Sequence, residues 1–109
     1  MTELVDEARV QRALDYLIKT DEEFAKAKSY MEGIDRQEKS ILAAEFLKSE
    51  GSIEVRKAVA ATSEAYKNWQ EYNKQAVLDY EIMRNKRNTA DLIIELYRTL
   101  CANRRKGNV

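Results

Sequence analysis

Histidine is absent from this chain of 109 residues, and its absence excludes the commonest catalytic arrangements. Histidine is the usual general base, and many serine and cysteine nucleophiles and most zinc sites depend on it. The one cysteine, Cys101, can form neither a structural zinc site nor an intramolecular disulfide, and we interpret it as a small buried hydrophobe. The chain also lacks the glycine-rich loop that cradles phosphate in nucleotide-binding proteins. We therefore expect a protein that is not an enzyme and has no cofactor or metal.

Carboxylates are the remaining groups that could do chemistry, and the densest cluster of them is Asp21-Glu22-Glu23. Such a cluster could bind a metal ion. Di-metal helical bundles, however, use a Glu-x-x-His pattern that a chain without histidine cannot form. Acidic residues also interact favourably with the positive end of a helix dipole. We interpret these three acids as the first turn of a helix.

Basic residues concentrate near the C-terminal end, where they could contact phosphate groups. This basic strip consists of Arg84, Lys86, Arg87, Arg98, Arg104, Arg105 and Lys106. Part of it has a structural explanation, because Arg98 can pair with Glu95 and the last three bases complement the negative end of a helix dipole. The net charge of zero and the sequence pI of about 6.4 are unlike those of a dedicated DNA-binding domain. Nucleic acid therefore remains an alternative partner.

The composition predicts a few long helices in a single domain. The chain has no proline and only 3 glycines, which are the main residues of turns, and 35% of its residues are charged. The predicted helices span residues about 3–19, 21–49 and 53–106. In the first helix, Val10, Leu14, Leu17 and Ile18 fall on one face.

The boundaries between the predicted helices rest on capping residues and glycines. Thr20 with Glu23 matches a capping box and predicts a break before residue 21, although a helix running through is the alternative. The middle helix is either continuous or split near Gly33. Gly51 and the following serine form the clearest turn. The last helix is either continuous or broken near Asn88.

The last predicted helix carries a heptad pattern, with apolar positions spaced alternately four and three residues apart. This seam consists of Val55, Val59, Thr62, Tyr66, Trp69, Asn73, Ala76, Tyr80, Met83, Arg87, Ala90, Ile94, Tyr97 and Cys101. Asn73 and Arg87 either fix the register of packed helices or leave the seam open to solvent or phosphate. If Arg87 fixes the register, we expect Arg87→Leu to strengthen the helical assembly.

A second apolar stripe lies on another face of the same helix. It consists of Leu78, Ile82, Leu92, Ile93, Leu96 and Leu100. The two earlier helices can fold back and cover the seam, but the second stripe then needs another partner, most simply a second copy in a symmetric dimer. We therefore predict an all-α fold, an elongated helical hairpin or three-helix bundle that forms an oligomer of undetermined size. Its oligomer or partner interface is this stripe.

No signal peptide or membrane span is recognisable in the sequence. The N-terminus is acidic and lacks an apolar run, and no stretch reaches the roughly 18 apolar residues of a transmembrane helix. We expect a cytoplasmic protein without a membrane partner.

The C-terminal quarter carries a resemblance to a known group of proteins. The segments MRNKRNTADLIIELYRT (83–99) and ANRRKGN (102–108) resemble the C-terminus of small uncharacterised phage or prophage helical proteins from early recombination and replication gene blocks. The resemblance contains no catalytic motif and assigns no active-site residue. It implies a role in host interaction, recombination or DNA handling.

Three functions are consistent with these patterns. The first is a protein that docks on a host or phage protein through the second stripe and modulates it. The second is a nucleic-acid-binding accessory protein that uses the basic strip and shows steep salt dependence. The third is a structural coiled coil that assembles only with itself. We rank the first hypothesis highest.

Overall fold

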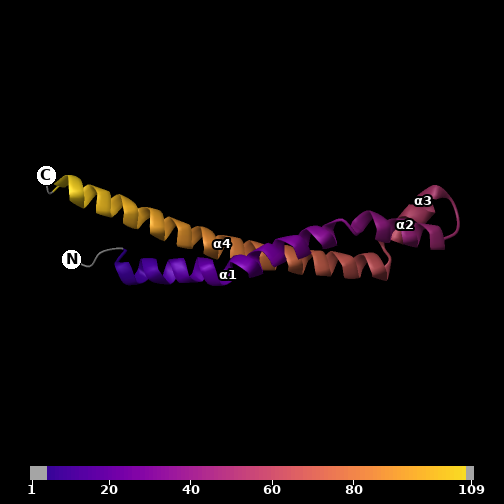
Figure 1. Ribbon diagram of the computed structural model, residues 1–109. Helices are drawn as coiled ribbons and strands as arrows, with labels where there is room; N and C mark the ends of the chain where they lie inside the picture. Colours follow the sequence, from indigo (N-terminus) through magenta and orange to yellow (C-terminus); the bar gives the residue numbers. More distant parts are fainter. Residues whose placement is uncertain (1–4, 108–109) are drawn as a thin grey trace. The chain divides into compact units, whose positions relative to one another are not determined.

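The computed structural model describes residues 5–107, and α-helices make up almost all of them (Figure 1). This part of the chain contains four α-helices and no β-strand. They are α1 (Glu7–Asp35), α2 (Glu38–Lys48), α3 (Ile53–Ala61) and α4 (Glu64–Gly107). The predicted all-α fold with a long C-terminal helix is confirmed. None of the helices in the described range combines the length and apolar character needed to cross a membrane.

Helix α1 begins at Glu7, later than predicted. Asp6 provides the cap, because its Oδ1 accepts the backbone N–H of Arg9 at 2.8 Å. Residues 3 and 4 of the predicted first helix lie outside the described residues.

The predicted helix break at Thr20 is wrong, because α1 runs through this residue. The Thr20 hydroxyl donates to the carbonyl oxygen of Tyr16 at 2.7 Å, a common arrangement for threonine inside a helix. The same oxygen accepts a hydrogen bond from Arg87 Nη1 at 2.7 Å. Thr20 therefore contacts the other long helix and does not cap a new one.

Of the two alternatives left open for the middle helix, the structure has the split near Gly33, since α1 ends at Asp35 and α2 begins at Glu38. The backbone N–H of Gln37 donates to the Ile34 carbonyl at 3.0 Å and closes the turn. The turn at Gly51 is confirmed. Gly51 has a φ of 115°, which favours glycine, and the Ser52 side chain accepts the backbone N–H of Val55 at 3.3 Å to cap α3.

The helix predicted over residues 53–106 is interrupted at Thr62 and Ser63, which separate α3 from α4. The Thr62 hydroxyl donates to the Ala58 carbonyl at 2.8 Å, and the Ser63 hydroxyl donates to the Ala60 carbonyl at 2.7 Å. Ser63 Oγ also accepts the backbone N–H of Tyr66 at 3.2 Å and so caps α4. These hydroxyls offer the backbone an alternative to helical hydrogen bonds, and the helix restarts after them.

The seam is buried only within α4. Every seam position from Tyr66 to Cys101 is buried or half-buried, whereas Val55 and Val59 of α3 are 51% and 44% exposed. The seam prediction is therefore correct for α4 and wrong for α3. No break occurs near Asn88, because α4 is continuous there.

Contacts divide the chain into two compact units. Unit 1 comprises the described residues of Met1–Phe24 and Ile82–Val109, and unit 2 comprises Ala25–Glu81. In unit 2, Ile34, Trp69 and Ala76 form a buried cluster, and Trp69 Nε1 donates to the Ile34 carbonyl at 2.7 Å. Helices α2 and α3 contact each other there. Arg56 donates to the Phe46 carbonyl and lies over the Phe46 ring, 4.2 Å from its centroid.

Unit 1 is an antiparallel pair formed by the first part of α1 and the second part of α4 (Figure 1). The direction follows from two contacts. Arg87 contacts Leu17, and ten residues later along α4, Tyr97 contacts Glu7 near the start of α1. The pair is the framework of the candidate site.

Candidate functional site

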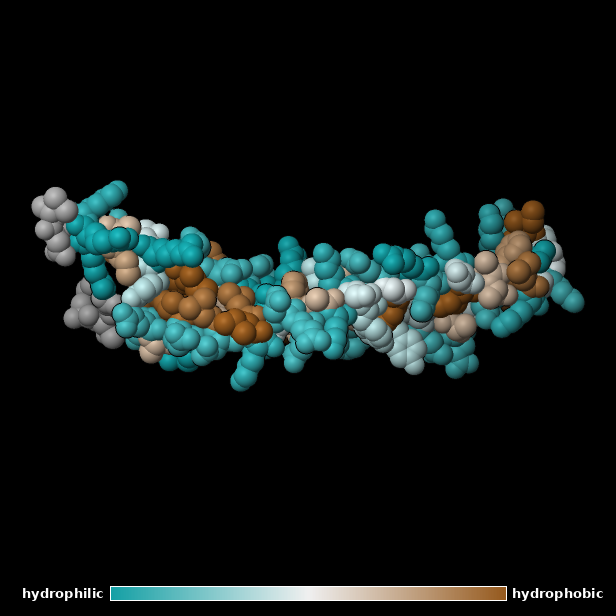
Figure 2. Space-filling model, in the orientation of Figure 1, coloured by the Kyte–Doolittle hydropathy of each residue, from teal (hydrophilic) through white to brown (hydrophobic). Residues whose placement is uncertain are grey.

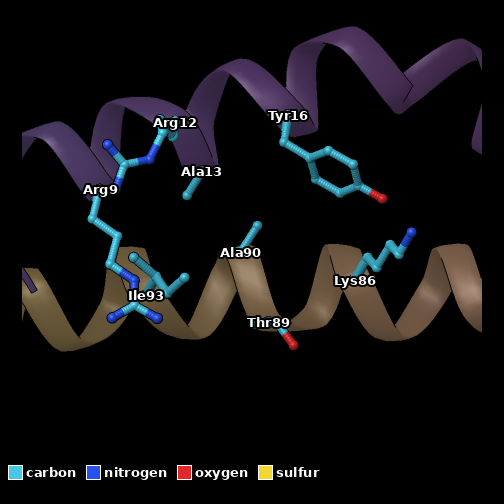
Figure 3. Close-up of a pocket in the computed structure, with 8 residues that line it drawn as sticks. All are labelled: Arg9, Arg12, Ala13, Tyr16, Lys86, Thr89, Ala90 and Ile93. Carbon is cyan, nitrogen blue, oxygen red and sulfur yellow. The ribbon is translucent and has the colours of Figure 1, made fainter.

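A groove lies between α1 and α4 in unit 1 (Figure 3). Its volume is about 400 Å³. Four residues of each helix line it: Arg9, Arg12, Ala13 and Tyr16 from α1, and Lys86, Thr89, Ala90 and Ile93 from α4. A groove of this kind offers a partner a surface from two helices at once.

The floor of the groove is formed by two small residues that face each other. Ala13 and Ala90 are 6% and 5% exposed, and Figure 3 shows their methyl groups pointing across the gap between the helices. Alanine is the smallest side chain that a helix readily accepts. The larger residues beside it therefore form raised walls, and the space above the two alanines stays empty.

The walls of the groove carry positive charge and no negative charge. Its eight lining residues include Arg9, Arg12 and Lys86 but no aspartate or glutamate. Figure 3 shows Arg9 reaching from α1 to the side of Ile93 on α4. Arg12 and Lys86 are exposed and have no ion-pair partner within residues 5–107. Unpaired cations on low-dielectric walls produce a positive potential that attracts anionic groups.

Exposed apolar side chains also lie on α4, with Ile82 one turn before Lys86, Leu96 about one turn after Ile93, and Leu92 further round the helix from the groove. Ile82, Leu92 and Leu96 are 45%, 68% and 42% exposed, while Ile93 and Leu100 are half-buried. Ile93 belongs both to this row and to the groove wall. We call Ile82, Leu92, Ile93, Leu96 and Leu100 the outer stripe. Figure 2 shows hydrophobic side chains gathered over this unit.

The second stripe predicted from the sequence is thus largely uncovered, as expected for a face that the chain's own helices do not pack against. Its remaining member, Leu78, is 50% exposed and belongs to unit 2.

Arg87, a member of the predicted basic strip, is used inside the helix pair. Its guanidinium donates to the Leu17 carbonyl at 2.9 Å and to Thr20 Oγ1 at 2.7 Å, and it pairs with Asp21 Oδ1 at 3.3 Å. It also lies 5.0 Å from the centroid of the Phe24 ring. Only 16% of the Arg87 side chain is exposed. Little of Arg87 is therefore accessible to nucleic acid, and its contacts favour the alternative in which it fixes the helix register.

The rest of the basic strip does not form one surface. Lys86 lines the groove, whereas Arg84 lies two residues earlier and so on roughly the opposite side of a helix with about 3.6 residues per turn. Arg98 pairs with Glu95 at 3.1 Å, as predicted. Arg84 and Arg104 each interact with another residue. Arg105 and Lys106 are exposed in the last turn of α4.

Tyr97 and Cys101 lie near the start of α1. The Tyr97 hydroxyl donates to Glu7 Oε1 at 3.3 Å. A hydrogen bond with Cys101, partial burial and the nearby Glu7 raise the pKa of Tyr97 to about 12. Cys101 is half-buried, which agrees with its interpretation as a small apolar residue. In the described part of the chain, no three His, Cys, Asp or Glu side chains are arranged so that they could hold a metal ion.

Sequence reasoning missed the α1 side of the groove. From Val10 to Ile34, α1 has its own alternation of three and four residues, and each of its positions is buried or half-buried: Val10, Ala13, Leu17, Thr20, Phe24, Ala27, Met31 and Ile34. The predicted face through Leu14 and Ile18 is wrong, because these residues are 40% and 76% exposed. The continuous pattern was detectable, but taking Thr20 as a cap divided it. Recognising Ala13 as a seam position would have placed Arg12 and Tyr16 beside it.

Comparison of the chain with protein-family models, with curated proteins and with solved structures finds no match.

Proposed function

We propose that the chain is a non-enzymatic helical interaction protein that binds another protein through the outer stripe of α4. The observation that carries this proposal is the exposure of Ile82, Leu92 and Leu96 at 45%, 68% and 42% on a helix that also lines a groove. Apolar residues scattered singly over a surface are ordinary, whereas exposed apolar residues that gather on one helix are typical of an interaction surface. Apolar residues on one helical face suit helix-to-helix docking.

The resemblance of residues 83–108 to small phage proteins supports a partner that acts in phage recombination or replication. Such proteins belong to recombination and replication gene blocks, so the partner would be a phage or host protein in the cytoplasm. The outer stripe falls largely within the same segment.

Selection of helical peptides from a displayed library against the full chain tests the proposal. We expect the selected peptides to lose about tenfold or more in affinity for the double variant Leu92→Ser/Leu96→Ser, since central apolar contacts dominate such interfaces. Leu47→Ser is the matched control, because Leu47 is 75% exposed and lies on α2. Peptides that bind the double variant as tightly as the wild type would contradict the proposal, as would a selection that returns none.

Self-assembly through the outer stripe is separated from partner binding by sedimentation velocity over a range of concentrations. A free chain that stays monomeric leaves the stripe open for a partner. A stable dimer that dissociates in the Leu92→Ser/Leu96→Ser variant would mean that a second copy covers the stripe, and the protein would then be a structural oligomer.

Nucleic-acid binding is a second candidate function, favoured by the exposure of Arg105 and Lys106 at the end of α4. Fluorescence anisotropy of single- and double-stranded oligonucleotides over a salt series tests it. Binding whose log affinity falls linearly with log salt would show that several phosphates are contacted. No binding at low salt would exclude this function.

A further inference from the structure

We propose that the partner presents an acidic amphipathic helix, which lays its apolar face on the outer stripe and directs its carboxylates to Arg12 and Lys86 in the groove. This inference rests on the proposed function and specifies the chemistry of the partner. The charge of the groove is the basis of this inference, because the exposed cations Arg12 and Lys86 line the groove and no acid does.

The two cations that matter most lie on opposite walls of the groove. Arg12 comes from α1 and Lys86 from α4. Both are exposed and have no ion-pair partner within residues 5–107. A helix lying on the outer stripe can therefore direct acidic residues from its groove-side flank to both cations. Arg is suited to this role because its guanidinium can hold a carboxylate with two hydrogen bonds.

The length of the surface suits a helix of ordinary size. The outer stripe extends from Ile82 to Leu100, which at about 1.5 Å per residue is roughly 27 Å. A partner helix of about 18 residues covers that distance. Apolar residues at every third and fourth position would meet the stripe, and acidic residues beside them would meet the groove walls.

A second copy of this chain does not fit the groove. A two-fold symmetric contact places the same patch of both molecules face to face. The groove lining of one copy would then meet the groove lining of the other, which contains Arg12 and Lys86 and no acid, and like charges in an interface are unfavourable. The charge of the groove thus favours a partner with a different, acidic surface.

Nucleic acid supplies negative charge but lacks the apolar surface that the outer stripe requires. Stacking of bases needs aromatic side chains, and Tyr16 is the one aromatic residue among the eight that line the groove. Leu92, Leu96 and Ile82 are aliphatic. An acidic amphipathic helix offers both negative charge for the groove and apolar side chains for the outer stripe.

Two synthetic peptides of about 20 residues, long enough to form helices, provide the test. They share a leucine face and differ only in their flanking residues, which are glutamate in one and lysine in the other. We expect the full chain to bind the glutamate peptide about tenfold more tightly than the lysine peptide, with the difference shrinking as salt is added. Isothermal titration calorimetry measures both affinities.

Charge-reversal variants make the test specific to the groove. Arg12→Glu/Lys86→Glu should reverse the preference, so that the lysine peptide binds more tightly. Lys57→Glu/Lys67→Glu is the matched control, because both lysines are exposed outside the groove and their reversal should leave the preference for glutamate in place. Circular dichroism checks that all variants retain their helix content, and Arg12→Gln with Lys86→Gln offers a milder pair if the reversal unfolds the chain.

The outcomes separate this inference from the proposed function. Equal binding of both peptides would overturn the inference that the partner is acidic. It would not contradict the proposal that the outer stripe binds a protein, which the library selection tests separately. Failure of both peptides to bind would overturn the inference, and so would a preference for glutamate that survives the charge reversal. Displacement of the glutamate peptide by an oligonucleotide at lower concentration would show that the groove binds nucleic acid instead.

Discussion

Arg87 shows how a polar residue can hold two helices in one alignment. Its guanidinium reaches the Leu17 carbonyl and the Thr20 hydroxyl on α1 at 2.9 and 2.7 Å, contacts available only when these turns lie opposite each other. Thr20 accepts the hydrogen bond from Arg87 while its own hydroxyl still donates to the Tyr16 carbonyl, so α1 keeps its helical hydrogen bonding there. A polar residue at such a position fixes register at some cost in stability.

Arg87→Leu should therefore keep or raise the melting temperature, whereas Arg87→Ala should lower stability by about 1–3 kcal/mol. Leucine fills the space beside Phe24 and leaves no buried polar atom unpaired, since Asp21 is 81% exposed. Alanine leaves a gap there. Thermal unfolding followed by circular dichroism measures both effects. Equal losses in the two variants would show that the polar contacts themselves stabilise the pair.

Asn73 is the other polar residue of the seam. Its Oδ1 is buried and has no hydrogen-bond partner in the described part of the chain. An unpaired buried acceptor costs about 1–3 kcal/mol. Asn73→Leu should therefore raise the midpoint of denaturant unfolding, and the exposed control Asn88→Leu should change it little. A fall in the midpoint for Asn73→Leu would mean that the amide is satisfied.

Tyr97 should remain protonated well above the pH at which an ordinary tyrosine ionises. Its hydrogen bond with Cys101, its partial burial and Glu7 raise its pKa from 10.0 to about 12. Because the folded-state pKa is raised, the folded state favours the neutral phenol, and this stabilisation is present below pH 10 and lost as the pH rises through 12. In a spectrophotometric titration at about pH 11, Tyr97→Phe should leave the phenolate signal nearly unchanged. A clearly smaller signal in the variant would show that Tyr97 titrates normally.

At the scale of the elements, the heptad pattern predicts which face of α4 is buried but not the residue at which α4 begins. The heptad spacing from Tyr66 to Cys101 depends on one helix face, so it can be read locally. The break at Thr62 and Ser63 could not be inferred from spacing, because both residues also occur inside helices. The opposite error occurred at Thr20, whose partner Arg87 lies 67 residues away and gives no local signal.

The cap at Ser63 gives a direct test of the α3–α4 boundary. Ser63→Ala removes the acceptor of the Tyr66 backbone N–H and should lower the free energy of unfolding by about 1 kcal/mol. Ser29→Ala, at an exposed position within α1, should have no such cost, because alanine is the better helix former. Denaturant unfolding measures both. A neutral Ser63→Ala would mean that α4 does not depend on this cap.

At the scale of the whole molecule, the sequence predicts an uncovered apolar face but not the groove beside it. The outer stripe is visible as a second row of leucine and isoleucine on one helix. The alternation along α1 identifies Ala13 as a buried position, but its place opposite Ala90 depends on how segments far apart in the chain align, which no local pattern shows. The basic strip failed as a single surface for a related reason. Its members lie on different sides of α4, and Arg87 is turned inward.

The central claim is that the outer stripe binds a protein helix, and site-specific photo-crosslinking tests it most directly. A photoreactive residue is placed at Leu92 in one variant and at Leu47 in another, both of which are exposed in the free chain. A library-selected helical peptide is then added to each. Crosslinking from position 92 but not from position 47 is the predicted result, whereas equal crosslinking from both, or crosslinking from position 47 alone, would contradict the claim.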